Sequence, residues 1–250
     1  MKTDSGLAAF IASPARKLRQ EAFICGCGHS GTTILANILA AHPEVFVPLN
    51  ETNVFRKKPW AARVELAMLR LNAKRAAKPV LLEKTPKHIR RLDLLFRLSP
   101  HARLIVPVRD GRDVAASIAK RNGGDLDKGI DRWIADNTIV SAIRNQPNVF
   151  CYRYEDFIEN PQFMLKKICG FLEIDWRESL FDYHKQSRNW FNQKAVKAAA
   201  AEEHEAYRNW QVNQPIFDGR NKWRQTYFEA DMSRLYEGEG GDLMRAWNYI

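Results

Sequence analysis

The feature that most constrains this chain is a glycine loop near its start, Gly26-Cys27-Gly28-His29-Ser30-Gly31-Thr32-Thr33. The loop follows a short apolar run, Phe23 to Cys25, and precedes an amphipathic helical pattern over residues 33–41. In such a loop, successive backbone N–H groups and the positive end of the helix can converge on an anion. The sequence therefore predicts a phosphate-binding loop at residues 26–33.

The spacing of this loop is that of a P-loop, G-x-x-x-x-G-K-[ST], except that Thr32 stands at the position of the lysine. A nucleoside triphosphatase needs the lysine and a magnesium ion to offset the charge of the β and γ phosphates. A loop that offers hydroxyl groups instead is better matched to a less charged terminus, such as that of a phosphosulfate. The alternative is that the loop binds no ligand and is a turn that only connects a strand to a helix.

Three more apolar runs, Val80 to Leu82, Leu104 to Val108 and Val149 to Tyr152, predict buried strands. Helical patterns cover residues 33–41, 60–76, 89–98, 113–121, 131–144 and 161–172. Alternating strands and helices predict an α/β fold, a single domain with a mostly parallel central sheet flanked by helices. We assign residues 21–250 to this domain and residues 1–20 to an N-terminal extension.

Pro107 cannot donate a hydrogen bond within a central strand, so we expect its strand to end there. Ligands of open α/β sheets bind outside the carboxyl ends of the strands. Arg109 is therefore expected to stand where a ligand sits.

The chain is basic, with 39 Lys and Arg against 29 Asp and Glu and a net charge of +10. Such a surface attracts anions: nucleotides, acidic glycans, membrane headgroups or nucleic acid. No groove-reading helix pair or aromatic-basic repeat indicates nucleic acid, so we expect no nucleic-acid partner. No apolar run reaches membrane-spanning length, and Leu7 to Ala12 is too short for a signal peptide.

The four cysteines, at positions 25, 27, 151 and 169, are too few for the disulfide framework of a secreted domain. We therefore expect buried thiols and a cytoplasmic location. A zinc site of Cys25, Cys27 and Cys151 is the alternative, although a C-x-C within a glycine loop lacks the usual ligand spacing. No other cluster suggests a metal, and we expect none.

The string CGCGHSGTTILANILAAHPEV resembles the loop that binds the 5′-phosphosulfate of 3′-phosphoadenosine 5′-phosphosulfate (PAPS) in PAPS-dependent sulfotransferases, including the bacterial and tyrosylprotein branches. The resemblance implies a P-loop-like sulfotransferase fold. It assigns PAPS binding to Gly28, His29, Ser30, Gly31, Thr32 and Thr33. His29 departs from the family pattern, in which Arg or Lys is usual, so its part in stabilising the leaving group is open.

Three later segments resemble further family signatures. LIVPVRDGRDVAAS implies that Arg109 and Ser117 bind the 3′-phosphate, while Arg112 and Asp113 cap or pair within the turn. VFCYRYEDFIENP places Tyr154 near the nucleotide, with Glu155, Asp156 and Pro161 fixing the turn. DGRNKWR resembles a late basic loop that closes over the nucleotide, with Arg220 and Lys222 as candidates for the 3′-phosphate; Trp223 is alternatively packed core.

Two catalytic residues are expected beyond the loop. Glu51 stands in an E-T context like that of the catalytic glutamate in similar enzymes, and we predict that it is the general base. An exposed loop glutamate is the alternative for Glu51, and His42 is the rival base. Lys84, in a K-x-P segment, is predicted to offset charge on the donor oxygens, with His29 sharing this role.

The sequence thus predicts a sulfotransferase that moves a sulfuryl group from PAPS to a hydroxyl or amine of a small molecule, glycan or peptide tyrosine, releasing 3′-phosphoadenosine 5′-phosphate (PAP). The rival function is a P-loop kinase or nucleotide-binding protein that lacks the usual lysine. The acceptor and the oligomeric state are not predicted, although residues 52–78 and 184–218 are the regions left for an acceptor.

Overall fold

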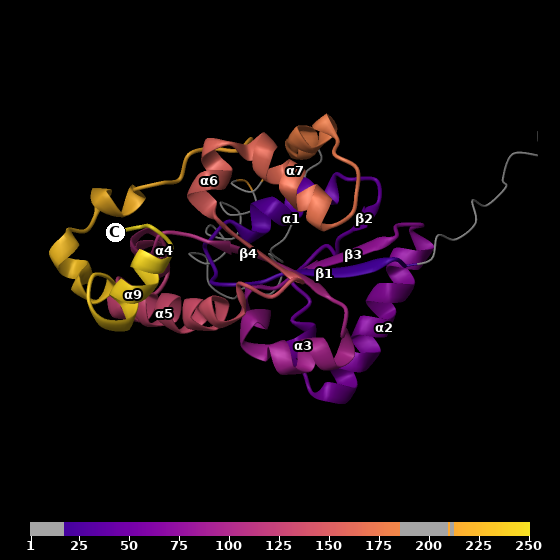
Figure 1. Cartoon of the computed structure of the whole chain (residues 1–250), viewed down its shortest axis with the longest axis horizontal. Helices are drawn as coiled ribbons and strands as arrows, with labels where there is room; N and C mark the ends of the chain where they lie inside the picture. Colours follow the sequence, from indigo (N-terminus) through magenta and orange to yellow (C-terminus); the bar gives the residue numbers. More distant parts are fainter. Residues whose placement is uncertain (1–17, 186–209, 211–212) are drawn as a thin grey trace, which may run out of the picture.

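The computed structural model describes residues 18–185, 210 and 213–250 (Figure 1). Most of the predicted N-terminal extension and most of the segment 184–218 lie outside these residues. The domain boundary near residue 20 stays a prediction.

The centre of the molecule is a five-stranded sheet with the order β2-β3-β1-β4-β5. Its strands are β1 (Gln20–Ile24), β2 (Val45–Phe46), β3 (Val80–Lys84), β4 (Arg103–Val108) and β5 (Val149–Arg153). Every pairing is parallel. The predicted parallel sheet is confirmed, and the two-residue β2 adds an edge strand that the sequence pattern did not reveal.

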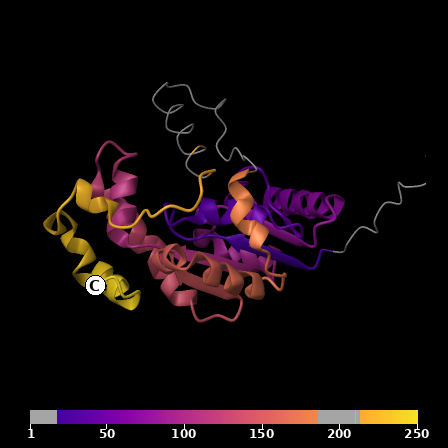
Figure 2. The same ribbon diagram turned by 90° about the horizontal axis from the view of Figure 1, so that it is seen from above.

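Helices cover both faces of this sheet (Figure 1). On one face lie α1 (Thr32–Ala40), α6 (Tyr154–Glu159) and α7 (Pro161–Phe171), and on the other lie α2 (Pro59–Arg75), α3 (Leu92–Leu98) and α5 (Leu126–Ile143). At one end α9 (Gly238–Ala246) packs against α5, near α4 (Gly111–Ala119), while α2 stands at the opposite end (Figures 1 and 2). Short 3₁₀ helices span Val54–Arg56, Pro86–Arg91, Glu178–Lys185, Lys222–Gln225 and Glu229–Leu235.

Side chains of β1 alternate between the two helical layers, as the period of two in a strand requires. Ala22 and Ile24 pack with Leu35 of α1, whereas Phe23 packs with Leu66 of α2. Each such large apolar side chain, fully buried, stabilises the fold by about 1.5–3 kcal/mol. Burial on both faces explains why the strands appear in the sequence as continuous apolar runs.

Pro107 lies one residue before the end of β4. The N–H of Leu104 bonds to Asn148 on the β5 side, and the carbonyl of Ile105 accepts from Cys25 on the β1 side. The backbone groups of successive residues in a strand point to opposite neighbours, so the nitrogen of Pro107 points toward β1. The pairing of β1 with β4, however, ends at Ile105. The proline removes no ladder hydrogen bond there.

The cysteines are free, and all but Cys151 are buried. Burial raises the pKa of the Cys25 and Cys27 thiols, and it raises that of Cys151 to about 12, so all three stay protonated near neutral pH. Among the residues that the structure describes, no group of three His, Cys, Asp or Glu is placed to hold a metal ion. Within the same ranges, no helix is both long and apolar enough to cross a membrane.

Candidate active site

The predicted site residues gather at the carboxyl edge of the sheet. Lys84 ends β3 directly beside Ile24, which ends β1, and Val108, which ends β4, pairs with Arg153 of β5. The glycine loop, Arg109 and Tyr154 follow immediately after β1, β4 and β5. This edge is where open α/β sheets bind their ligands.

Backbone conformation explains two glycines of the loop. Gly26 has φ 129° and Gly31 has φ 87°, values that residues with a Cβ rarely adopt. A Cβ on Gly31 would also lie 2.8 Å from the ring of Tyr154, which packs directly on the loop. Tyr154 is therefore part of the wall of the predicted phosphate site.

The loop also leaves a buried polar atom without a partner. Ser30 is wholly buried, and its Oγ has no hydrogen-bond partner among the described residues. Thr32 and Thr33, which begin α1, are buried beside it. An anion held by the loop would satisfy such hydroxyls, which matches the predicted role of residues 28–33.

Glu51, Lys84 and Thr33, which are far apart in the sequence, meet at this edge. The Lys84 side chain is fully buried, and its Nζ donates to Glu51 Oε1 at 2.7 Å and to Thr33 Oγ1 at 3.1 Å. The Glu51 side chain keeps 31% of its surface exposed. The cluster therefore joins a cation, a loop hydroxyl and a carboxylate that an incoming molecule can reach.

Glu83, which the sequence analysis did not select, anchors the segment that carries Glu51. Its Oε1 accepts from Thr52 N at 3.2 Å, Thr52 Oγ1 at 2.9 Å and Thr85 Oγ1 at 2.7 Å. Its Oε2 lies 3.0 Å from His88 Nδ1, and both side chains are fully buried. The sequence did contain a signal for this role. Glu83 is an acidic residue in a mostly apolar strand, and a buried carboxylate needs hydrogen-bond or charged partners.

Burial by itself would raise the pKa of Glu83, but the charge of His88 and the hydrogen bonds from His88, Thr85 and Thr52 outweigh it and hold the pKa below its ordinary value of 4.5. A carboxyl group whose pKa is lowered by folding stabilises the fold above the unfolded-state pKa, and this contribution is lost as the pH falls through the lower folded-state value. We expect the free energy of unfolding, measured in urea, to fall more steeply below pH 4.5 in the unmodified chain than in Glu83→Gln.

The exposed Glu178→Gln serves as the control for this titration and should follow the unmodified chain. Equal slopes for Glu83→Gln and the unmodified chain would contradict the predicted contribution of Glu83.

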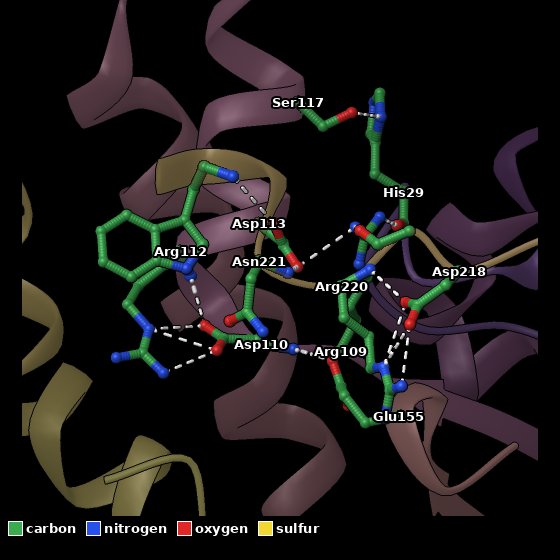
Figure 3. A network of polar contacts seen from close by, with 12 residues as sticks. His29, Arg109, Asp110, Arg112, Asp113, Ser117, Glu155, Asp218, Arg220 and Asn221 are labelled. Carbon is green, nitrogen blue, oxygen red and sulfur yellow. Dashed lines mark hydrogen bonds and ion pairs between the residues drawn. The ribbon is translucent and has the colours of Figure 1, made fainter. Parts of the chain in front are cut away.

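Arg109 contacts several segments on the side of the site that is predicted to bind the nucleotide (Figure 3). Its guanidinium donates to the backbone oxygens of His29, at 3.1 Å, and Gly219, and it lies 3.3 Å from Asp113 Oδ2. It also lies over the Tyr154 ring, 4.8 Å from the centroid. Its Nε is buried and has no hydrogen-bond partner among the described residues, so a donor remains for a ligand.

His29 contacts Ser117 and Arg121. Its Nδ1 lies 2.7 Å from Ser117 Oγ, and its Nε2 lies 3.1 Å from Arg121 Nη1. The imidazole thus lies between a hydroxyl group and a guanidinium group at the edge of the loop.

The late basic loop is held by Asp113, which accepts from the backbone N–H groups of Asn221 at 2.9 Å and Trp223 at 3.1 Å (Figure 3). Asp113 pairs with Arg109 in its own turn, as expected, and it also fixes this distant segment, while Arg112 pairs with Asp110. Trp223 is buried core.

The two cations of the late loop lie near its exposed side. Arg220 donates to Asp218, and exposed Lys222 lies 4.9 Å from the Phe217 ring. Glu155 accepts from Asp110 N and Tyr249 Oη, which fits its predicted role in fixing the turn.

A group of cations that the sequence analysis missed lies beside the loop. A Cβ on Gly28 would meet Arg132 Nη2 at 2.7 Å, so this guanidinium touches the loop. The pKa of Lys87 is lowered, first by partial burial and then by Arg132, Arg56 and Arg90. This crowding of positive charge favours an anion near the loop.

Comparisons with known proteins identify similar families and relatives. A sulfotransferase family model matches residues 56–178, and a sulfotransferase domain model matches residues 122–237. Protein-tyrosine sulfotransferase 1 of Danio rerio is 26% identical over 199 residues, which cover 65% of this chain and 56% of that protein.

Two solved structures share the fold. The sulfotransferase domain of the Synechococcus PCC 7002 olefin synthase aligns with a TM-score of 0.67 and 19% identity, over 94% of this chain and 96% of that one. A mouse sulfotransferase in complex with PAP aligns with a TM-score of 0.61 and 16% identity, over 91% and 85%.

The fold is therefore the P-loop-like α/β fold of the sulfotransferases. The chain belongs to the sulfotransferase family, as the two overlapping family models show. It spans about half the length of the curated relatives that it matches, 56%, 52% and 40% of the first three.

Proposed function

We propose that the chain transfers a sulfuryl group from PAPS to a hydroxyl or amine of an acceptor and releases PAP. The observation that carries this proposal is the contact of Lys84 Nζ with Glu51 Oε1 and Thr33 Oγ1 at the phosphate loop. A reaction of this kind needs a base for the acceptor and positive charge at the donor, and this cluster offers both.

Glu51 is proposed as the general base. Its carboxylate is partly exposed and can take the proton from an acceptor hydroxyl or amine. The Glu83 contacts with Thr52 hold the adjacent backbone, so Glu51 is positioned before an acceptor binds. His42 is a poorer candidate, because its ring bonds to the backbone of Asp175 and Glu44 and is buried.

Lys84 is proposed to stabilise negative charge on the donor. PAPS, when bound, supplies the sulfuryl group and a nucleotide leaving group. The Lys84 ammonium is fixed by two hydrogen bonds in a buried position, where an electrostatic interaction is stronger than in water. His29, which contacts Ser117 Oγ and Arg121 Nη1 beside the loop, is proposed to share this role.

The residues present fit the nucleotide. The loop residues Gly28, His29, Ser30, Gly31, Thr32 and Thr33 would hold the 5′ end, and Arg109 and Ser117 would hold the 3′-phosphate. The unpartnered Ser30 Oγ and Arg109 Nε support this assignment. Tyr154 would line the site, with Arg220 and Lys222 at its edge. We propose that no metal takes part.

Arg109→Ala should weaken PAP binding about 10- to 100-fold, because a charge-assisted hydrogen bond to phosphate would be lost. Calorimetry with PAP and with adenosine 5′-phosphate distinguishes this role from a structural one. Loss of affinity for both nucleotides alike, or for neither, would contradict the assignment of Arg109 to the 3′-phosphate.

The rival function, a nucleoside triphosphate-dependent kinase, is tested by thermal shift. We expect PAP without magnesium to raise the melting temperature of the chain more than ATP with magnesium does at the same concentration. The reason is that a ligand that binds only the folded state stabilises it by RT ln(1 + L/Kd), where L is the free ligand concentration, which is larger for the tighter ligand. A larger shift with ATP and magnesium would favour the kinase, whose missing lysine at Thr32 would then need another explanation.

We also propose a cytoplasmic location, which the free thiols support because they persist in reducing compartments. The acceptor class is left open among small molecules, glycans and peptide tyrosines. Incubation of the chain with labelled PAPS and a metabolite extract, followed by identification of the labelled product, would name it.

A further inference from the structure

The outer face of α2 carries an apolar stripe that no other described part of the protein covers. Trp60 is 70% exposed, Val64 56%, Met68 59% and Leu71 44%. Their spacing places them on one face of the helix, opposite Ala62, Leu66, Leu69 and Ala73, which are buried against the sheet. A contiguous exposed apolar surface of this kind marks an interaction site.

Positive charges flank this stripe. Lys58, Arg63, Lys74 and Arg75 are exposed on or beside α2. The one acidic residue within the helix, Glu65, already pairs with Lys57. The partner of the stripe therefore has to accept apolar side chains at its centre and cations at its margins.

An anionic lipid surface has this chemistry. Lys and Arg side chains can place their stems along the apolar region and their charged ends among lipid headgroups, while Trp and Leu enter the boundary of the acyl chains. The position of α2 at one end of the molecule, on the outside of its layer, leaves the helix free to lie along such a surface (Figures 1 and 2).

A second copy of the chain fits the stripe less well. Two α2 helices packed face to face would bring the cations of one beside the cations of the other, with no free carboxylate in either helix to offset them. Repulsion of like charges would oppose that contact.

We propose that α2 binds the surface of membranes that contain anionic lipids, through Trp60, Val64, Met68 and Leu71 and the cations around them. The binding is peripheral and independent of the catalytic cluster. Because the cytoplasmic leaflet carries the negative surface potential, this inference is compatible with the proposed location.

Sedimentation of the full chain with vesicles tests this binding. At low ionic strength we expect binding to vesicles of phosphatidylcholine with phosphatidylserine and little binding to phosphatidylcholine alone. The triple variant Arg63→Gln, Lys74→Gln, Arg75→Gln should bind anionic vesicles about 10²-fold more weakly. A matched variant, Lys120→Gln, Lys166→Gln, Lys185→Gln, removes the same charge from exposed positions elsewhere and should bind within a few fold of the unmodified chain.

A second pair of variants tests how much the apolar side chains of α2 contribute to vesicle binding. Trp60→Gln with Met68→Gln should lower vesicle binding by at least about tenfold, whereas Phe163→Gln with Phe228→Gln, at exposed positions outside α2, should not. Glutamine is a good helix former, so α2 should stay folded, and an unchanged thermal shift with PAP checks this.

Three results would overturn the proposal: no binding of the full chain to anionic vesicles, equal loss in the α2 variants and their matched controls, or a dimer that the Trp60→Gln, Met68→Gln variant dissociates while vesicle binding is absent. None of these results bears on sulfuryl transfer, which is tested separately.

Discussion

Glu51→Gln is expected to lower the turnover of labelled PAPS by about 10²-fold or more, the usual scale for loss of a general base. The amide keeps the size of the side chain and can still accept a hydrogen bond from Lys84, but it cannot take a proton from the acceptor. Calorimetry should show PAP affinity near that of the unmodified chain, because Glu51 is not among the residues assigned to the nucleotide.

Glu178→Gln is a matched control, since it removes an exposed carboxylate far along the chain from the cluster. It should turn over at the unmodified rate. If Glu51→Gln also does so, Glu51 is not the base, and the exposed-loop alternative for this residue is correct.

Lys84→Met is expected to lower turnover by about 10²- to 10³-fold, the range observed when a fixed electrostatic contact to a developing charge is removed. Methionine fills nearly the same buried volume without the charge, so the fold should be retained. The loss should fall on the rate at saturating donor rather than on PAP affinity alone.

Lys78→Met provides the comparison, because Lys78 donates to the backbone oxygens of His42 and Val45, outside the cluster. It should keep normal turnover. A Lys84→Met variant whose only defect is weaker PAP binding would assign Lys84 to ground-state binding instead of catalysis.

The sheet could be predicted from the sequence because each long strand carries a buried apolar run, with its polar residues at or near the strand ends. The same reasoning missed β2, which is only two residues long. It also placed the start of α5 at residue 131, although the helix begins at Leu126, where polar and exposed residues hide the pattern. Element boundaries are decided by caps such as Asp125, which accepts from Lys128 N.

The candidate site likewise combines residues that the sequence could identify with contacts that it could not. Glu51 and Lys84 could be selected because motifs carry them, and the pairing of Ile24 with Lys84 explains their approach to the loop. The hydrogen bonds from Thr52 to Glu83 and from the late loop to Asp113, in contrast, join segments that are distant in the sequence. No local pattern reveals such contacts.

The surroundings of His29 illustrate this limit. The sequence showed only that the residue departs from the family pattern. Its contacts with Ser117 Oγ and Arg121 Nη1 come from a segment 88 to 92 positions further along the chain, whereas Lys84 is the positive charge in contact with Glu51.

Transfer from PAPS carrying labelled sulfur to components of a metabolite extract tests sulfuryl transfer most directly. The predicted result is a labelled organic product formed together with an equal amount of PAP by the unmodified chain, and about 10²-fold more slowly by Glu51→Gln. Label that remains in PAPS with every extract, while ATP labelled in its γ-phosphate transfers that group in the presence of magnesium, would contradict sulfuryl transfer and establish a kinase.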